Sequence, residues 1–389
     1  MKRKHLLLML LSIGLFGGCA IIGPATSLPD NVEVYTRSLP YNNGRLGIER
    51  DNEDEFMLVY THPVVERWIK NPDRINWRVA LYSPSGADIV WTQDSGIADD
   101  SYFRGGRFYV PLDRQPDNGI LFFTIVDEKD SKLVQQFIRN NDSGTIGKNW
   151  LYENDSVCYS STTDVKFYKQ GYGLPLPITD YAAASLKFFQ ADSLIDYSSI
   201  GRKKCYGFTE TGFVELEGEE AVEIKAVVTA GYPEIKTAGQ LASSLRYLSY
   251  DSTIMNLTWN EQKIKVDSFW LSLTRGQEQA RRLLQGYYRR VRFANTQFTD
   301  WRPGYLTDRG EVYILLGTPD AVYISMETER WVYFPEGNGP GEQFVFRYVK
   351  FREQPIGWYL DWKPHYANLL SWGRDKWLNG KIVFFQVQD

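Results

Sequence analysis

The sequence predicts a multidomain protein that is rich in β-strands toward its N-terminus and combines helices with strands toward its C-terminus. The chain has 389 residues, which suits two or three domains. Up to about residue 229, short runs rich in Val, Ile, Phe and Tyr alternate with turn residues, as expected of strands. Beyond about residue 236, apolar residues recur every three or four positions, as expected of helices. We therefore expect a β-sandwich, a second β-rich domain and a C-terminal α+β domain.

The first residues have the pattern of an export signal. Basic residues at positions 2–4 precede a short apolar stretch, which ends in Gly17-Gly18-Cys19. The stretch is too short to span a membrane as a helix. Two interpretations remain open: an ordinary signal peptide followed by an accidental cysteine, or a bacterial lipobox, which these last three residues resemble.

The lipobox resemblance has definite implications. Residues 1–18 would be a lipoprotein signal peptide, Cys19 would carry the lipid, and residues 19–30 would form a linker. Ala20 rather than Asp follows the cysteine. By the same resemblance, this implies an outer-membrane location, lipid-anchored, at the periplasmic face.

Charge and cysteine content narrow the possible partners and cofactors. The formal net charge is −4 at pH 7 and there is no basic tail, so we expect no nucleic-acid partner. Cys158 and Cys205 are a candidate disulfide in an exported chain, the alternative being two buried free thiols. After the export signal the only histidines are His62 and His365, and no metal-ligand spacing occurs. We expect no metal and no other cofactor.

Residues 31–141 read as one β-sandwich. The runs "EFMLVYTHP", "NWRVALYSPSG" and "GILFFTIVDEKD" are strand candidates separated by turn signals. Their order resembles the immunoglobulin or macroglobulin-like domains of cell-envelope proteins, and that resemblance implies no active site. Residues 148–229 form the second β-rich region, with "DVKFYKQ", "ASLKFFQ", "CYGFT" and "FVELEG" as strand candidates.

The C-terminal region, residues 236–389, begins with helical patterns. The clearest is one continuous apolar stripe from Ala280 to Phe298. Five arginines lie mostly off this stripe, and they form either a solvated basic face or a docking face for an acidic partner or a phosphate. They are Arg281, Arg282, Arg289, Arg290 and Arg292, of which the first four are the candidate partner face.

Residues 303–320, "PGYLTDRGEVYILLGTPD", predict a short helix with marked ends. Asp308 and Glu311 have the spacing of a capping box, and Gly317 with Pro319 would end the helix. Val, Tyr and Ile in the same run also favour a strand. We expect Arg309 to pair with an acidic neighbour. Because this stretch lacks a histidine, lysine or cysteine, we interpret it as structural rather than catalytic.

The same residues resemble the GWxTD domain of bacterial envelope proteins, especially Bacteroidota lipoproteins. Tyr305 stands where the family has Trp. The resemblance implies a structural motif and a cell-envelope setting, and it implies no reaction. The motif positions are Gly304, Tyr305, Thr307, Asp308, Arg309 and Gly310, and all of them except Tyr305 match the family.

A second resemblance concerns the strands that follow the motif. "EVYILLGTPD" and "RWVYF" look like the small lipoprotein subunit of the outer-membrane β-barrel assembly machine. That resemblance implies two helices packed on a short antiparallel sheet that binds protein partners. We expect strands in "AVYISM", "RWVYF", "QFVFRYV" and "GWYLDW", and a last helix over residues 365–378.

These observations favour a non-catalytic, periplasm-facing outer-membrane lipoprotein. It would act as a scaffold or accessory subunit of an envelope assembly or secretion complex, with protein partners and a membrane contact through its lipid. The alternative is an envelope hydrolase or a glycan-binding lipoprotein. The absence of G-x-S-x-G, H-E-x-x-H, P-loop and Rossmann patterns argues against the enzyme.

Overall fold

The structure is a computed structural model, and the residues that it describes do not include the predicted export signal, Cys19 or the predicted linker. The described residues are 34–36, 45–51, 55–61, 75–84, 88–95, 102–104, 107–114, 116–127, 132–140, 150–154, 156–160, 164–169, 193–194, 197–200, 203–217, 222–249, 257–333, 342–351 and 354–382.

The N-terminal module consists of two four-stranded sheets with antiparallel pairing throughout. Their strand orders are β2-β3-β7-β6 and β5-β4-β8-β9. The strands of the first sheet are β2 (Arg45–Asp51), β3 (Glu55–Thr61), β6 (Tyr102–Arg104) and β7 (Arg107–Leu112). Those of the second are β4 (Ile75–Tyr82), β5 (Ile89–Asp94), β8 (Gly119–Asp127) and β9 (Lys132–Asn140).

The two sheets share one apolar core. Leu58 and Val110 from the first sheet belong to the same buried cluster as Val79, Leu121 and Phe123 from the second. Along β7 the buried positions alternate with more exposed ones, which is the period expected of a strand with one covered face. The alternation seen in the sequence thus places the core between the sheets.

A second β module follows. Its larger sheet has the order β10-β17-β16-β12-β13, and its smaller sheet has the order β11-β15-β14. A disulfide joins Cys158 on β11 to Cys205 on β15, which are directly opposite each other in the ladder, in agreement with the pairing expected from the sequence. The predicted strand "ASLKFFQ" lies outside the described residues. The strands are β10 (Trp150–Tyr152), β11 (Ser156–Ser160), β12 (Asp164–Lys169), β13 (Ser193–Leu194), β14 (Tyr197–Ile200), β15 (Lys203–Gly207), β16 (Gly212–Glu217) and β17 (Val222–Val228).

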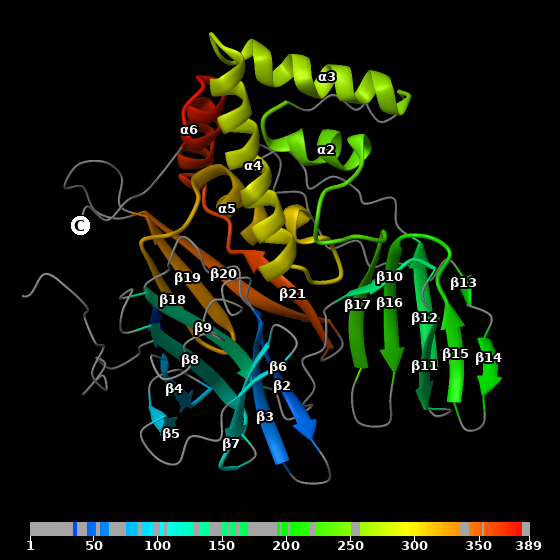
Figure 1. Ribbon diagram of the computed structural model, residues 1–389, viewed down its shortest axis with the longest axis vertical. Coiled ribbons are helices and arrows are strands. Elements are labelled where there is room, and N and C mark those ends of the chain that lie inside the picture. The colour runs from blue at the N-terminus through cyan, green and yellow to red at the C-terminus, as the bar shows by residue number, and fades with distance from the viewer. Residues whose placement is uncertain are drawn as a thin grey trace, which may run out of the picture.

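The C-terminal part combines helices with a five-stranded antiparallel sheet. The sheet order is β1-β18-β19-β20-β21, and the helices lie on one side of it, with α5 next to β21 and α3 packed on α2 and α4 farther from the sheet (Figure 1). The helices are α2 (Ala238–Ser244), α3 (Trp259–Ser272), α4 (Gln277–Gln297), α5 (Asp308–Leu316) and α6 (Tyr366–Leu378), with 3-10 turns η4 (Leu245–Tyr247) and η6 (Gly304–Leu306). The strands are β1 (Val34–Thr36), β18 (Ala321–Ile324), β19 (Thr328–Tyr333), β20 (Glu342–Phe351) and β21 (Gln354–Leu360).

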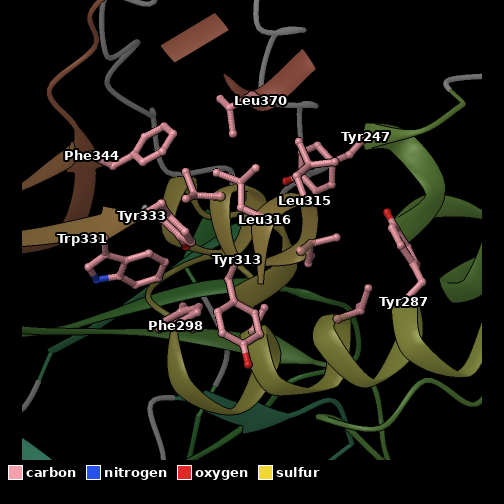
Figure 2. Close-up of a cluster of buried hydrophobic side chains, with 14 of the residues drawn as sticks. Tyr247, Tyr287, Phe298, Tyr313, Leu315, Leu316, Trp331, Tyr333, Phe344 and Leu370 are labelled. Atoms are coloured by element: carbon pink, nitrogen blue, oxygen red, sulfur yellow. The ribbon is translucent and has the colours of Figure 1, made fainter. Parts of the chain in front are cut away.

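The apolar stripe of α4 is the centre of this part. Leu283, Tyr287, Val291 and Ala294 are all buried, in the spacing that the sequence predicts. Aromatic side chains from the sheet meet them across α5, which is itself buried along its whole length (Figure 2). The four strands predicted from residue 321 onward and the last helix are present in the structure.

The N-terminal module packs against this C-terminal core. The side chains of Ala80, Ile120 and Phe122 point away from their own sheet-to-sheet core and join the C-terminal cluster. The amide of Met326, after β18, donates to the carbonyl oxygen of Pro84 at 2.9 Å. The outer face of β4 and β8 is therefore an interface between modules.

Among the described residues, no helix combines the length and the apolar character that crossing a membrane requires.

Candidate functional site

The predicted motif lies in the connection between α4 and α5 and in the first turn of α5. Residues 300–310 are here called the signature loop. Gly304 lies against the last turns of α4, where a Cβ atom would collide with the carbonyl group of Ala294. The neighbouring amide of Tyr305 donates to Asn295 Oδ1 at 3.0 Å. Gly310 packs in turn against the carbonyl oxygen of Gly304. The two motif glycines are therefore required by close backbone approach.

Thr307 is the N-cap of α5. Its Oγ1 accepts from the amide of Gly310 at 3.0 Å and donates to the carbonyl oxygen of Gly304 at 2.8 Å. The backbone of Thr307 is extended, as an N-cap requires, whereas Asp308 is already the first helical residue. The predicted capping box of Asp308 and Glu311 is therefore wrong, because Thr307, one residue earlier, is the N-cap of the helix.

Asp308 has a different task, which is to join the helix to the sheet. Its Oδ2 accepts from the amide of Leu360 on β21 at 2.7 Å, and its Oδ1 lies 4.0 Å from Arg302 Nη1. Burial raises the pKa of Asp308, although Arg302 and the Leu360 amide act in the opposite direction. A buried carboxylate here links α5, β21 and the signature loop.

Arg302 is the centre of a buried charged cluster. Its Nε and Nη2 donate to the Asp300 carboxylate at 3.2 and 2.9 Å. Its guanidinium also lies over the rings of Trp301 and Tyr359, 5.0 and 4.7 Å from the ring centres. Burial has the largest single effect on the pKa of Arg302 and lowers it. Asp300, Tyr359 and Asp308 together outweigh burial, so this pKa lies above its usual value. The bidentate pair fixes the start of the loop.

Arg309 forms the second buried pair. Its Nη1 donates to Glu329 Oε2 on β19 at 3.2 Å, which confirms the expected acidic neighbour. The other oxygen of Glu329 accepts from Trp331 Nε1 at 2.7 Å. The Arg309 guanidinium also lies over the Phe298 and Trp358 rings. This pair connects the helix to the middle of the sheet.

The second β module also contacts the signature loop. The hydroxyl of Tyr232, which follows β17, accepts from the amide of Gly304 at 2.9 Å and donates to the carbonyl oxygen of Asn295 at 3.1 Å. Trp301 places its ring edge-on to Phe213 of β16 at 5.3 Å and donates from Nε1 to the Tyr359 hydroxyl at 3.1 Å. The loop is thus a junction between two modules.

The predicted basic face of α4 requires a correction. Arg290 is buried, and its Nη1 donates to the carbonyl oxygens of Ile314 and Leu315 at 3.1 and 3.3 Å. It lies seven residues after Leu283, on the core side of the helix, and the last carbonyls of α5 need donors. Burial lowers the pKa of Arg290 to about 10.

The other three arginines of the candidate partner face are exposed. Arg282 pairs with Glu278 one turn earlier at 3.2 Å. Arg281 and Arg289 also point into solvent. The face that α4 presents therefore consists of three of the four predicted residues.

The polar side chains of the signature loop are buried inside the protein. Thr307, Asp308 and Arg309 are only 1%, 5% and 8% exposed, and each is engaged with neighbouring elements of the fold. In the part of the chain that the structure describes, no three His, Cys, Asp or Glu side chains are arranged to hold a metal ion. These side chains are arranged to position α4, α5 and the sheet relative to one another.

Sequence reasoning missed several members of this network. Asp300 and Arg302 stand directly before the motif, two residues apart, and this spacing of opposite charges was a usable signal. Glu329 was also detectable, because a carboxylate in the otherwise aromatic and apolar "RWVY" surroundings needs a partner. Tyr232 carried no local signal, since its partners are more than 60 residues away.

An α+β unit with a buried, charged signature loop between two helices defines the class of this region. The sequence model of the GWxTD domain family matches residues 213–379. Residues 213–379 are therefore a GWxTD domain. The match begins within β16, so the family unit includes the β16–β17 hairpin as well as the helices and the sheet.

Other comparisons add little. No curated protein matches the chain. Among solved structures, a multi-modular cell-surface chitinase, ChiW from Paenibacillus sp. str. FPU-7, aligns with 16% identity and a TM-score of 0.17 over 35% of this chain and 10% of the chitinase. A chimeric titin Z1Z2 carrying a decorin peptide aligns with 10% identity and a TM-score of 0.13 over 51% of this chain and 98% of the titin chain. At these scores neither alignment carries an argument about fold or function.

Proposed function

We propose that this protein is a non-catalytic scaffold or accessory subunit of an envelope assembly or secretion complex. The observation that carries the proposal is the use of the signature side chains. Asp308 and Arg309 join α5 to β21 and β19, and Arg302 pairs with Asp300 within the loop. Backbone and aromatic contacts of the same loop reach α4 and the second β module. A motif used in this way makes a rigid platform, and its charged groups are not displayed to a substrate.

Two further features belong to the same proposal. The N-terminal module is an immunoglobulin or macroglobulin-like sandwich, which is supported by two four-stranded antiparallel sheets around one core. The protein is a lipoprotein anchored through Cys19 at the periplasmic face of the outer membrane. That part rests on the lipobox resemblance of residues 17–19.

The exposed arginines of α4 are the proposed partner face. Arg281 and Arg289 point into solvent, while the opposite side of the helix is fixed in the core. A cationic surface on a rigid helix suits an acidic protein partner, and charges of this kind act mainly on the association rate.

Native purification of the tagged protein after mild crosslinking tests the scaffold. The Arg281→Glu/Arg289→Glu variant should recover less partner than the wild type, with the largest difference at low salt, where charges are least screened. The matched control is Lys263→Glu/Lys265→Glu, which makes the same charge change at exposed positions on α3 and should leave recovery intact. A monomer without a partner, combined with hydrolysis or binding of envelope glycan or hydrolysis of peptide, would favour the alternative.

The anchor is tested separately by fractionation. Cys19→Ser should move the protein from the membrane fraction to the soluble periplasmic fraction, since the acyl chains would supply the membrane affinity. Retention of this variant in membranes after a high-salt wash would contradict lipid anchoring while leaving the scaffold proposal to the purification experiment.

A further inference from the structure

One strand of the C-terminal sheet comes from outside the GWxTD domain. The family match covers residues 213–379, which include β18, β19, β20 and β21. The fifth strand, β1, consists of Val34–Thr36 and pairs antiparallel with β18. Its register places Val34, Tyr35 and Thr36 opposite Ile324, Tyr323 and Val322.

β18 needs such a neighbour. It is a short apolar strand, "AVYI", in which three of four side chains are buried. An apolar edge strand with unpaired N–H and C=O groups is a template for pairing with other chains. At the opposite end of the sheet, β21 contacts β17 of the second β module. β17 lies within the family match, whereas the strand that covers β18 comes from outside it.

We propose that the outer edge of β18 is a strand-acceptor site and that its occupant is the segment 34–36 of the same chain. Extended segments bind such edges through main-chain hydrogen bonds, and β1 pairs with β18 in this antiparallel geometry. The pairing attaches residues 34–36 to the GWxTD domain rather than to the nearby N-terminal module.

This inference has a consequence that rests on the proposed lipid anchor. Cys19 precedes Val34 by about 15 residues, and an extended chain of that length spans at most ~50 Å. If β1 is paired and Cys19 carries the lipid, the β18 edge stays within that distance of the membrane. The GWxTD domain, and not the N-terminal module alone, is then held close to the bilayer.

A disulfide crosslink tests the register. Tyr35→Cys with Tyr323→Cys, in the full chain with Cys19→Ser, puts thiols at directly opposite positions. Mild oxidation should form an intramolecular crosslink. The control pair, Tyr35→Cys with Ala321→Cys, is two residues out of register and should react roughly tenfold more slowly. Equal rates, or no crosslink in the first pair, would overturn the proposal, and a crosslinked dimer would show that a second copy supplies the strand.

Amide hydrogen exchange provides a test without added thiols. Tyr35→Pro removes a donor and disfavours the strand, so the amides of β18 should exchange roughly tenfold faster while those of β20 stay unchanged. Tyr35→Ala keeps the backbone amide and serves as the matched control, with wild-type exchange expected. Unchanged exchange in β18 of the Tyr35→Pro variant would refute the pairing.

These experiments are independent of the anchor. They use backbone pairing and the unlipidated Cys19→Ser chain, so failed lipidation leaves their outcome unaffected. Conversely, a lipidated protein whose β1 does not pair would keep the proposed function and lose only this inference.

Discussion

Asp308 is a motif side chain that connects α5 to β21. The residue is 5% exposed, and its carboxylate accepts from the amide of the half-buried Leu360. Asp308→Ala should therefore lower the free energy of unfolding by about 1–3 kcal/mol, because this amide loses its acceptor. Asp308→Asn keeps an acceptor and should be milder. Urea unfolding of both variants measures the difference.

The same carboxylate predicts a pH dependence. Because burial raises the pKa of Asp308, the folded state binds its proton more tightly than the unfolded chain does. Ionisation at neutral pH thus disfavours folding, and this penalty disappears as the pH falls through the raised pKa. Lowering the pH should therefore shift the stability difference between wild type and Asp308→Asn in favour of the wild type. A difference that stays constant with pH would contradict the buried, ionising carboxylate.

At the scale of the element, α5 depends on both of its ends. Gly317 follows the helix with a φ of +90°, and a Cβ atom there would lie 2.6 Å from Arg290 Nη2. The same arginine donates to the last carbonyl oxygens of the helix. The end of α5 is thus shaped jointly by a glycine and by a buried cation from α4.

This arrangement predicts coupled mutations. Gly317→Ala should destabilise by about 1–3 kcal/mol through backbone strain and the clash with Arg290. Arg290→Met should also destabilise by about 1–3 kcal/mol, because carbonyl groups lose a donor. The double variant should be less destabilised than the sum of the two, since the clash is absent. Thermal or urea unfolding of all four proteins checks this, and strict additivity would exclude the contact.

Local elements were largely predictable from the sequence, because their signals are local. The stripe of α4 and the end of α5 at Gly317 follow from periodicity and backbone chemistry. The N-cap at Thr307 and the burial of Arg290 did not follow, since each depends on a neighbour that only the fold supplies. Thr307 and Asp308 are consecutive polar residues, and either could cap the helix. In the structure Asp308 accepts from the Leu360 amide, and Thr307 is the N-cap.

At the scale of the whole molecule, the contacts that the sequence does not predict are those between residues far apart in the chain. The pairing of β1 with β18 joins residues almost 300 positions apart, and no periodicity encodes it. The same holds for the outer face of β4 and β8, where Ala80 and Phe122 pack on another module. The pairing of Cys158 with Cys205 was accessible only because two cysteines remained after the one in the lipobox-like segment.

The disulfide predicts a redox-dependent stability. It joins residues with a sequence separation of 47, and a loop of that length corresponds to about 4 kcal/mol in the chain-entropy treatment. Reduction should therefore lower the urea midpoint of the wild type. The Cys158→Ser/Cys205→Ser variant should have the lower midpoint from the start and should show no further change with reductant. A wild-type midpoint that is insensitive to complete reduction would contradict the prediction.

We expect Trp301 to contribute strongly to the joint unfolding of the second β module and the rest of the GWxTD domain. Its ring contacts Phe213 of β16 on one side, and its Nε1 bonds to the Tyr359 hydroxyl of β21 on the other. Trp301→Ala removes both contacts and leaves the cation of Arg302 without one of its two aromatic neighbours. We expect a loss of about 3 kcal/mol at this junction.

The experiment measures whether the two parts of the domain unfold together, as well as how stable they are. In the Trp301→Ala variant, amides of β16 and β17 should lose protection at lower urea than those of α4 and α5, while in the wild type the two sets should open together. Trp259→Ala is the matched control, because that tryptophan is 58% exposed and its loss should change stability by less than about 0.5 kcal/mol. If the two sets of amides still open together in the Trp301→Ala variant, the modules are held by contacts other than the signature loop, and the loop's role is confined to placing α4 and α5 on the sheet.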